Sequence, residues 1–357
     1  MPARSERTTP PTIRDVADHV GVSPATVSRV LNNYPHLRPE IRVKVLEAIA
    51  ELGYERNRVA QRLRATRSLV IGLVVTDITN PFLSTIMATV EAVFAEHGYS
   101  VLMSNTASDA QREHNYLNMM ASEGVAGLVV VPTSENAERV RELAESGMPV
   151  VIIDRLMQDA PLDCILSDNI GGAQSAVEHL LTLGHQKIGH IGGPLQVTSG
   201  RQRLEGYLQA MQAAGLPVDP GWIRIADHRY EGGYQNTVNL LSDHPELTAL
   251  FIENNMMSLG ALTALHDQQV RIPDDLSIVG FDDLPWYTVL NPPLTVIVQA
   301  TSDIGHRAAS LLLERIEQPT LPPRIAILPT TLLTRGSTAP VSSRKNAQTQ
   351  KGGRADR

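Results

Sequence analysis

This chain of 357 residues contains two different patterns of apolar and polar residues, and the pattern changes near residue 68. In the first part, apolar side chains recur every three or four positions, which predicts short amphipathic helices. In the second part, short apolar runs alternate with helical stretches, which predicts two similar α/β lobes with parallel sheets covered on both faces. The expected strands are residues 69–75, 100–105, 127–132, 149–154, 164–168, 187–193, 223–226, 249–254 and 276–282, and the expected helices between them include 81–97 and 111–123.

The first amphipathic pattern, within residues 12–33, consists of two short helices on either side of Gly21. Thr12 can cap the first helix and pair with Asp15 three residues later. Gly21 can leave that helix through a positive φ, and Ser23-Pro24 supplies a cap and a first-turn proline for the second. This pattern favours a DNA-binding helix-turn-helix over a helical hairpin of an all-α domain. The side chains expected inside are Ile13, Val16, Ala17, Val20, Val27, Val30 and Leu31.

A third amphipathic helix follows and ends around Gly53, which completes a headpiece over residues 12–56. Its inward residues are expected to be Ile41, Val45, Leu46 and Ile49.

The outer side of the second helix carries the candidate DNA contacts. Arg29 can donate two hydrogen bonds to a guanine, whereas Pro24 and Ala25 can offer only apolar contacts, for example to a thymine methyl. Thr26 also points outward. The residues better placed for phosphates, which position a protein without specifying a sequence, are Thr12, Ser23, Ser28, Asn32 and His36.

The net charge of −7 is distributed unevenly. Residues 1–67 carry a balance of +5 and residues 340–357 a balance of +4, while the part between them carries −16. A basic end on an acidic body concentrates the attraction for DNA phosphates at the headpiece. Residues 1–11 and the basic tail 340–357 lack apolar periodicity, and both are expected to be disordered. The tail either adds non-specific DNA affinity or is a solvated end without a role.

Composition and motifs exclude several classes of protein. A polar N-terminus without an apolar core and the lack of a long apolar run predict neither a signal peptide nor a membrane span, hence a cytoplasmic protein. The single cysteine, Cys164, is expected to be a buried core residue. Gly189-His190-Ile191-Gly192-Gly193 lacks the order of a dinucleotide-binding turn, and phosphate-binding, serine-elbow and zinc-protease motifs do not occur. An enzyme is therefore not expected, nor a cofactor, and His179, His185 and His190 are interpreted as structural.

Several short motifs occur in a characteristic order: the helix-turn-helix, the basic residues 58–64, Gly72-Leu73-Val74 with Asn80-Pro81-Phe82, Leu183-Gly184-His185, Gly192-Gly193-Pro194, and Gly280-Phe281-Asp282-Asp283 with Pro292-Pro293-Leu294-Thr295. This order resembles the lactose-repressor family of bacterial transcription regulators over residues 12–338. The resemblance implies a body of the periplasmic-binding-protein fold. It implies an N-terminal lobe of residues 68–168 and 299–328 and a C-terminal lobe of 169–298 and 329–339, within an effector-binding and dimerisation domain over 68–339.

Polar residues follow the carboxyl ends of the expected strands, where open α/β sheets bind ligands. Carboxylates can accept paired hydroxyls, arginines can donate to oxygens and an aromatic ring can cover the C–H face of a sugar, so a polyhydroxylated ligand suits them. The resemblance assigns the cleft between the lobes to a small effector, often a sugar. The residues concerned are Asn80, Phe82, Asp154, Arg155, Ser199, Arg203, Asn254 and Asp282. For Asp154 and Asp282 the alternative is a turn cap, and for Arg155 a surface ion pair.

The chain departs from the family's pattern at two places in this cleft. His228 stands where an aromatic residue often covers the ligand, with Tyr230 two residues on, and Asn254-Asn255 replaces the usual Asn-Asp. Trp286 could supply a stacking face, or it could pack at the rim of a lobe. Asp168, at a lobe crossover, is expected to fix the turn.

The resemblance also implies a hinge helix in residues 57–67 that forms on operator DNA, pairs with the same segment of a second copy and inserts Leu63 into the minor groove. Arg58 and Arg62 would contact DNA beside it. The alternative is a plain linker with Leu63 packed on the body. The expected protein is thus a homodimeric regulator, a repressor, that binds a palindromic operator and is switched by a sugar or sugar derivative. The rival is the solute-binding protein of a sugar transporter, which would need an export signal and no headpiece.

Overall fold

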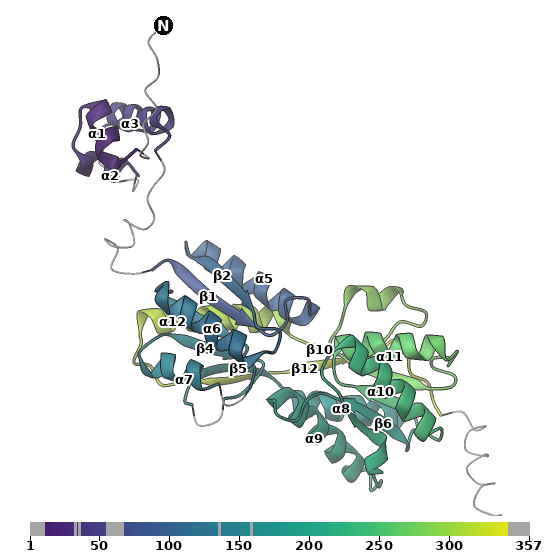
Figure 1. Ribbon diagram of the computed structural model, residues 1–357. Helices are drawn as coiled ribbons and strands as arrows, with labels where there is room; N and C mark the ends of the chain where they lie inside the picture. Colours follow the sequence, from purple (N-terminus) through teal and green to yellow (C-terminus); the bar gives the residue numbers. More distant parts are fainter. Residues whose placement is uncertain are drawn as a thin grey trace, which may run out of the picture. The chain divides into compact units, whose positions relative to one another are not determined.

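The structure, a computed structural model, describes residues 11–31, 34, 37–54, 68–134, 137–157 and 160–341. The chain divides into two compact units, Met1–Ser68 and Leu69–Arg357 (Figure 1). Five candidate DNA contacts lie outside the described residues, namely Asn32, His36, Arg58, Arg62 and Leu63. The predicted hinge within 57–67 lies outside them too, as do residues 1–10 and 342–357 of the two expected disordered ends.

The first unit contains the three predicted helices, α1 (Ile13–Val20), α2 (Pro24–Leu31) and α3 (Pro39–Leu52). Thr12 caps α1 in the predicted box with Asp15, and Gly21 ends it in the left-handed region with a φ of 73°. The Ser23 hydroxyl accepts a hydrogen bond from the Thr26 backbone N–H at 3.1 Å and caps α2. The side chains that form the core of this unit are Val16, Ala17, Val27, Val30, Val45 and Ala48.

The inward face of α3 differs from the prediction at one residue. Leu46 is 50% exposed, so its expected place in the core is wrong. Val45 is fully buried, and a helix turns by about 100° per residue, which carries Leu46 off the buried stripe. Ala48 takes the inner position three residues after Val45.

The N-terminal lobe of the body is a six-stranded parallel sheet in the order β11-β5-β4-β3-β1-β2. Its strands are β1 (Val70–Val75), β2 (Ser100–Asn105), β3 (Gly127–Val130), β4 (Val150–Ile153), β5 (Asp163–Ser167) and β11 (Ile325–Leu328). The helices on it are α5 (Pro81–Glu96), α6 (Ala110–Ser122), α7 (Glu138–Glu145) and α12 (Thr301–Glu317).

Alternating residues of β1 show why its sequence is a continuous apolar run. Leu73 packs on one face of the sheet in a cluster with residues of α5 and α12, while Val74 packs on the other with residues of α6 and α7. Both faces are therefore covered. Gly72 permits close packing on the second face, because a Cβ there would lie 2.5 Å from side-chain atoms of Met120 and Leu128.

The C-terminal lobe repeats this architecture with the strand order β12-β10-β9-β8-β6-β7, in which only β12 pairs antiparallel. Its strands are β6 (Ile188–Gly192), β7 (Ile223–Ile225), β8 (Ala249–Ile252), β9 (Ser277–Phe281), β10 (Thr295–Gln299) and β12 (Thr330–Leu333). Its helices are α8 (Asn169–Thr182), α9 (Thr198–Ala213), α10 (Tyr230–Asp243) and α11 (Asn255–Asp267), with the 3-10 turns η1 (Pro220–Trp222) and η2 (Pro285–Val289). The predicted α/β fold is confirmed.

The chain passes between the two sheets after β5, after β10 and after β11 (Figure 1). At the first passage the Asp168 carboxylate caps α8 by accepting a hydrogen bond from the Gly171 N–H at 2.9 Å, as expected of a turn-fixing residue. Cys164 is buried in β5, and burial raises the pKa of its thiol to about 12, so its interpretation as a core residue is confirmed. No described helix is both long and apolar enough to span a membrane.

Candidate functional site

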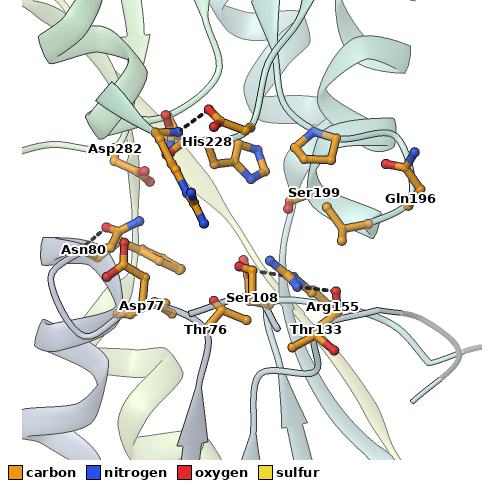
Figure 2. A pocket seen from close by; sticks show the side chains of 18 of the residues that line it. Thr76, Asp77, Asn80, Ser108, Thr133, Arg155, Gln196, Ser199, His228 and Asp282 are labelled. Carbon is orange, nitrogen blue, oxygen red and sulfur yellow. Dashed lines mark hydrogen bonds and ion pairs between the residues drawn. The ribbon is translucent and has the colours of Figure 1, made fainter. Parts of the chain in front are cut away.

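A cavity of about 620 Å³ lies between the two lobes of the body (Figure 2). Its walls are formed largely by residues that follow strands of both sheets, the place where parallel sheets bind ligands. Nine of the ten predicted effector residues line it, namely Asn80, Phe82, Asp154, Arg155, Ser199, Arg203, His228, Asn254 and Asp282.

Trp286 is the predicted residue that the structure does not bring to the cavity, because it is not among the lining residues and is 45% exposed. It lies in η2, where neighbouring side chains point about 120° apart. The next residue, Tyr287, is fully buried and donates a hydrogen bond from its hydroxyl to the Asn255 carbonyl at 3.0 Å. The inward Tyr287 leaves Trp286 facing solvent.

The sequence interpretation missed several lining residues, which include Thr76, Asp77, Ser108, Thr133, Gln196, Asp227, Arg229 and Gln299. The strand-end rule could have found Thr76 and Asp77, which come directly after β1, and Gln299, which closes β10. Gln196 lies in the turn before α9, and the pattern of apolar residues carries no signal for it.

The N-terminal lobe contributes an Asp-Arg pair directly after β4. Asp154 has a left-handed φ of 68°, and its carboxylate lies 3.8 Å from Nε of Arg155. The Arg155 guanidinium donates to the carbonyls of Pro132 at 2.6 Å and Thr133 at 3.1 Å. Arg155 is only 7% exposed, so it is not the surface ion pair of the alternative interpretation. It is held in the wall of the cavity (Figure 2).

The C-terminal lobe contributes Ser199 and Arg203 from successive turns of α9, and both are buried. The Arg203 guanidinium donates to Oδ1 of Asn169 at 2.8 Å and to the Glu253 carbonyl at 2.6 Å. It also lies 3.8 Å from the ring centroid of Phe281. Arg203 therefore ties α8, α9, β9 and the end of β8 together in the wall of the cavity.

Asp282 follows β9 and is 5% exposed. One of its carboxylate oxygens accepts from the Gln299 side-chain amide, and the other accepts from the Asn255 N–H at 3.4 Å. Burial raises the pKa of Asp282, an effect that the nearby Arg203 charge and the two hydrogen bonds oppose. Asp282 also lines the cavity, so capping and ligand contact do not exclude one another here.

Two asparagines connect these elements. Asn254 caps α11 through Met257 N–H at 2.8 Å and donates to the His228 carbonyl at 2.9 Å, so its amide orients the turn that carries His228. Asn80 caps α5 and accepts from the side chain of Asn255 at 2.9 Å, which joins the two lobes directly. Phe82, in the first turn of α5, borders the cavity beside Asn80 and is 8% exposed.

In the described part of the chain, no three or more His, Cys, Asp or Glu side chains gather in a way that could hold a metal ion. His185 bonds to Thr248 and to the Ala339 carbonyl, both at 2.9 Å, and His179 bonds to Thr338 at 2.9 Å. These contacts fit the structural role expected of the histidines.

The headpiece presents the outward face of α2 as predicted. Pro24, Ala25 and Arg29 are exposed, and Thr26 and Ser28 are half-buried beside them. The Arg29 guanidinium lies 5.9 Å from the ring centroid of Tyr34. At Thr12 and Ser23 the hydroxyls already act as helix caps.

Two family descriptions match successive parts of this chain. Residues 12–57 match "Bacterial regulatory proteins, lacI family", and residues 68–335 match "Periplasmic binding proteins and sugar binding domain of LacI family". The chain belongs to the lacI family of bacterial regulatory proteins. Among its lacI-family relatives, the Ribose operon repressor of Escherichia coli K12 is 35% identical over 91% of this chain and 99% of its own length. The repressor PurR of Haemophilus influenzae PittEE is 37% identical over 85% of this chain and 91% of its own length.

Solved structures of lacI-family proteins are similar to this chain in fold. The lac repressor dimer bound to operator and an anti-inducer covers 93% of this chain and all of its own, with a TM-score of 0.83 and 31% identity. A lacI-family regulator from Enterococcus faecium with bound ribose covers 76% of this chain and all of its own, with a TM-score of 0.70 and 29% identity. The prediction of a DNA-binding transcriptional regulator whose body binds a small molecule is confirmed.

Proposed function

We propose that this lacI-family protein is a cytoplasmic, homodimeric repressor that binds a palindromic operator and is switched by a sugar or sugar derivative in the cavity. The observation that carries the proposal is the presence of both parts in one chain. A helix-turn-helix with an exposed Arg29 precedes a cavity lined by Asp154, Arg155 and Asp282 from opposite lobes. A palindromic operator follows from a two-fold symmetric dimer.

The domain division supports this assignment of roles. Residues 12–56 would read DNA, 57–67 would act as the hinge, and the two lobes of 68–339 would bind effector and dimerise. Within the headpiece, Arg29 would specify a base pair, and Pro24, Ala25 and Thr26 would contact bases or backbone beside it. The residues assigned to phosphates are Thr12, Ser23, Ser28, Asn32 and His36.

For residues 58–64 we retain the hinge-helix proposal on compositional grounds. The segment carries one large apolar side chain, Leu63, among three arginines, and is too short to form a stable helix alone. An inserted leucine unstacks a base step and kinks the duplex, which favours a deformable pyrimidine–purine centre. Leu63→Ala should then bend the operator less and bind it more weakly, and Arg58 and Arg62 should contribute phosphate contacts. An unchanged bend and affinity would favour a plain linker.

The effector site is expected to suit a polyol. Asp154 and Asp282 offer carboxylate oxygens to hydroxyl pairs, Arg155 offers donors, and Phe82 offers an apolar face. The cavity of about 620 Å³ lies in the usual range for small-molecule sites. Because relatives include ribose operon repressors and a regulator solved with ribose, D-ribose is the first ligand to test.

Switching would follow from the origin of these residues in both lobes. A ligand that bridges Asp154 and Asp282 fixes the relative orientation of the lobes, and the N-terminal lobe leads directly into the hinge segment. A ligand shifts operator affinity only as far as it prefers one lobe arrangement, typically about 1–3 kcal/mol.

A thermal-shift screen of the full chain against pentoses, hexoses, polyols and purine bases tests the proposal. A ligand at 100 times its dissociation constant stabilises the protein by about 2.7 kcal/mol, which is readily detected. Stabilisation by a sugar supports the proposal. Stabilisation by a purine base alone would overturn the assignment to a sugar, and the relatives named PurR make that the informative competitor.

A further inference from the structure

Glu253 is a fully buried carboxylate that follows β8 just behind the cavity and does not line it. Within the described residues, its ion-pair neighbours are two histidines and no lysine or arginine. Oε2 lies 3.6 Å from Nε2 of His190, and Oε1 lies 3.9 Å from Nε2 of His228. Oε2 also accepts a hydrogen bond from the Gly193 N–H, whereas Oε1 has no hydrogen-bond partner in the described part of the chain. Burying a carboxylate oxygen without a hydrogen-bond donor costs free energy, and native proteins contain few such atoms.

The backbone holds His228 in a defined place. Its φ is 63°, in the left-handed region, and its carbonyl accepts from Asn254. Its ring rests against Gly193, where a Cβ would lie 1.7 Å from Nε2, so only glycine leaves room for this position. Figure 2 shows the ring reaching into the cavity from the C-terminal lobe.

The two ring nitrogens of His228 meet different surroundings. Nε2 is buried, has no hydrogen-bond partner among the residues that the structure describes, and lies 3.9 Å from Oε1 of Glu253. The His228 side chain is 19% exposed and lines the cavity, and because Nε2 is buried, Nδ1 is the nitrogen that can face a ligand. A carboxylate can only accept, so it favours an N–H at Nε2, and in a neutral imidazole that leaves a lone pair on Nδ1.

His190 is the second histidine beside Glu253. It is fully buried between the rings of Tyr207 and Phe251, whose centroids lie 5.0 and 5.2 Å from its own. Burial lowers the pKa of His190 to about 4, against the opposing effect of Glu253, so it is neutral at the pH of a cell. His190 can offer Glu253 an N–H but no charge, and the imidazole that reaches the ligand is that of His228.

We propose that Glu253 is a positioning residue, which orients the His228 ring and holds its proton on Nε2 so that Nδ1 accepts a hydrogen bond from an effector hydroxyl. This inference rests on the proposed function, because it requires a hydroxylated ligand in the cavity. It makes His228 a specificity-determining contact, since a site built to bond a hydroxyl discriminates against an analogue that lacks it. Glu253 and His228 together would select the effector by a hydrogen bond, whereas an aromatic ring at this position would select it by shape.

Glu253→Gln gives the sharpest test of positioning. If the glutamine carbonyl retains the Gly193 N–H, its NH₂ group faces Nε2 of His228, which must then become the acceptor. The proton moves to Nδ1. Long-range proton–nitrogen NMR spectra of the full chain with ¹⁵N-labelled histidine, assigned with His228→Phe, report which nitrogen is protonated. We expect Nε2–H in the parent and Nδ1–H in Glu253→Gln. The same protonated nitrogen in both, or Nδ1–H in the parent, would overturn the positioning role.

Calorimetry with D-ribose and its monodeoxy analogues tests the selection. We expect one analogue to bind the parent about 10-fold more weakly than ribose and to lose that disadvantage in His228→Phe. Glu253→Gln should weaken ribose binding in the parent but not in the His228→Phe background. If the two substitutions acted independently, their losses of binding free energy would be additive. Additive losses would contradict the inference and leave the proposed function intact. If no sugar binds the parent, the proposed function fails and the selection by His228 fails with it.

Discussion

Asp154 and Asp282 occupy corresponding positions in the two lobes and face the same cavity. Each is the first residue after a strand, β4 or β9, and each has a left-handed φ, of 68° and 75°. The charge of Asp154 contributes to the raised pKa of Asp282, so the two carboxylates repel one another across the cleft. Left-handed aspartates carry some backbone strain, and such strain gathers at binding sites. A ligand with hydroxyls for both carboxylates would join the lobes at this point.

Replacing Asp282 by asparagine should separate function from stability. Folding raises the pKa of the Asp282 carboxyl, so its protonated form adds to the stability of the native state at low pH. That contribution to the free energy of unfolding is lost as the pH rises through the raised pKa. Above its raised pKa, the ionised carboxylate of Asp282 therefore costs stability relative to the unfolded chain. We expect Asp282→Asn to unfold at the same or a higher temperature than the parent, and to lose the effector response. A clear drop in unfolding temperature would show that its ionised form stabilises the fold.

The operator contact of Arg29 can be tested by substitution. Arg29→Ala should weaken operator binding by about 1–3 kcal/mol and relax selectivity at one symmetric pair of positions, because a bidentate base contact is lost. Lys44, exposed on α3, supplies a control, since Lys44→Ala should affect all sequences alike. Binding to a panel of single-base operator variants measures both. Selectivity that is unchanged in Arg29→Ala would contradict the assignment.

Local rules predicted the fold because the segments obey them individually. The run around Leu73 is apolar at every position since both faces of its sheet are covered, and Gly21 ends a helix as a glycine can. The strand-end rule placed Asp154 and Asp282 in one cavity because each directly follows a strand, and the carboxyl ends of the strands of both lobes border the cavity. Contacts between distant segments could not be predicted: Glu253 meets His190 and His228 only through the packing of β6, β8 and the turn after β7.

The same limit explains why Leu46 was placed wrongly and why Trp286 does not reach the cavity. Leu46 sits one step off a stripe that the small Ala48 completes, and size alone favours leucine for the core. Trp286 is aromatic and close to Asp282 in sequence, but the side chain that η2 turns inward is that of Tyr287.

The buried His190 predicts a dependence of stability on pH. Its pKa of about 4 in the native state lies below the ordinary value of 6.5, so the unfolded chain binds a proton first as the pH falls. The free energy of unfolding should decrease between about pH 6.5 and pH 4, by about 1.4 kcal/mol per unit from this group. Urea unfolding at several pH values, in the parent and in His190→Phe, measures the effect. An equal decrease in both proteins would assign it to other groups.

The hydrogen bond between Asn80 and Asn255 is a direct contact between the lobes at the cavity. Asn255→Ala removes it but leaves Asn80 bonded to Phe82 N–H as the cap of α5. We expect the lobes to separate more easily, so that a bound sugar dissociates faster, by several-fold for a contact of about 1 kcal/mol. Stopped-flow dissociation measures this rate. A rate equal to that of the parent would show that the contact does not hold the cleft closed.

Operator binding by fluorescence anisotropy, with and without the sugar that stabilises the full chain, tests the central claim most directly. We predict that the sugar changes the operator affinity of the parent about 5- to 150-fold. Asp282→Ala should bind the operator with the parent's sugar-free affinity and no longer respond, because the substitution alters the cavity and leaves the headpiece intact. An operator affinity that the sugar leaves unchanged in the parent, or a response retained in Asp282→Ala at the parental concentration, would contradict the account.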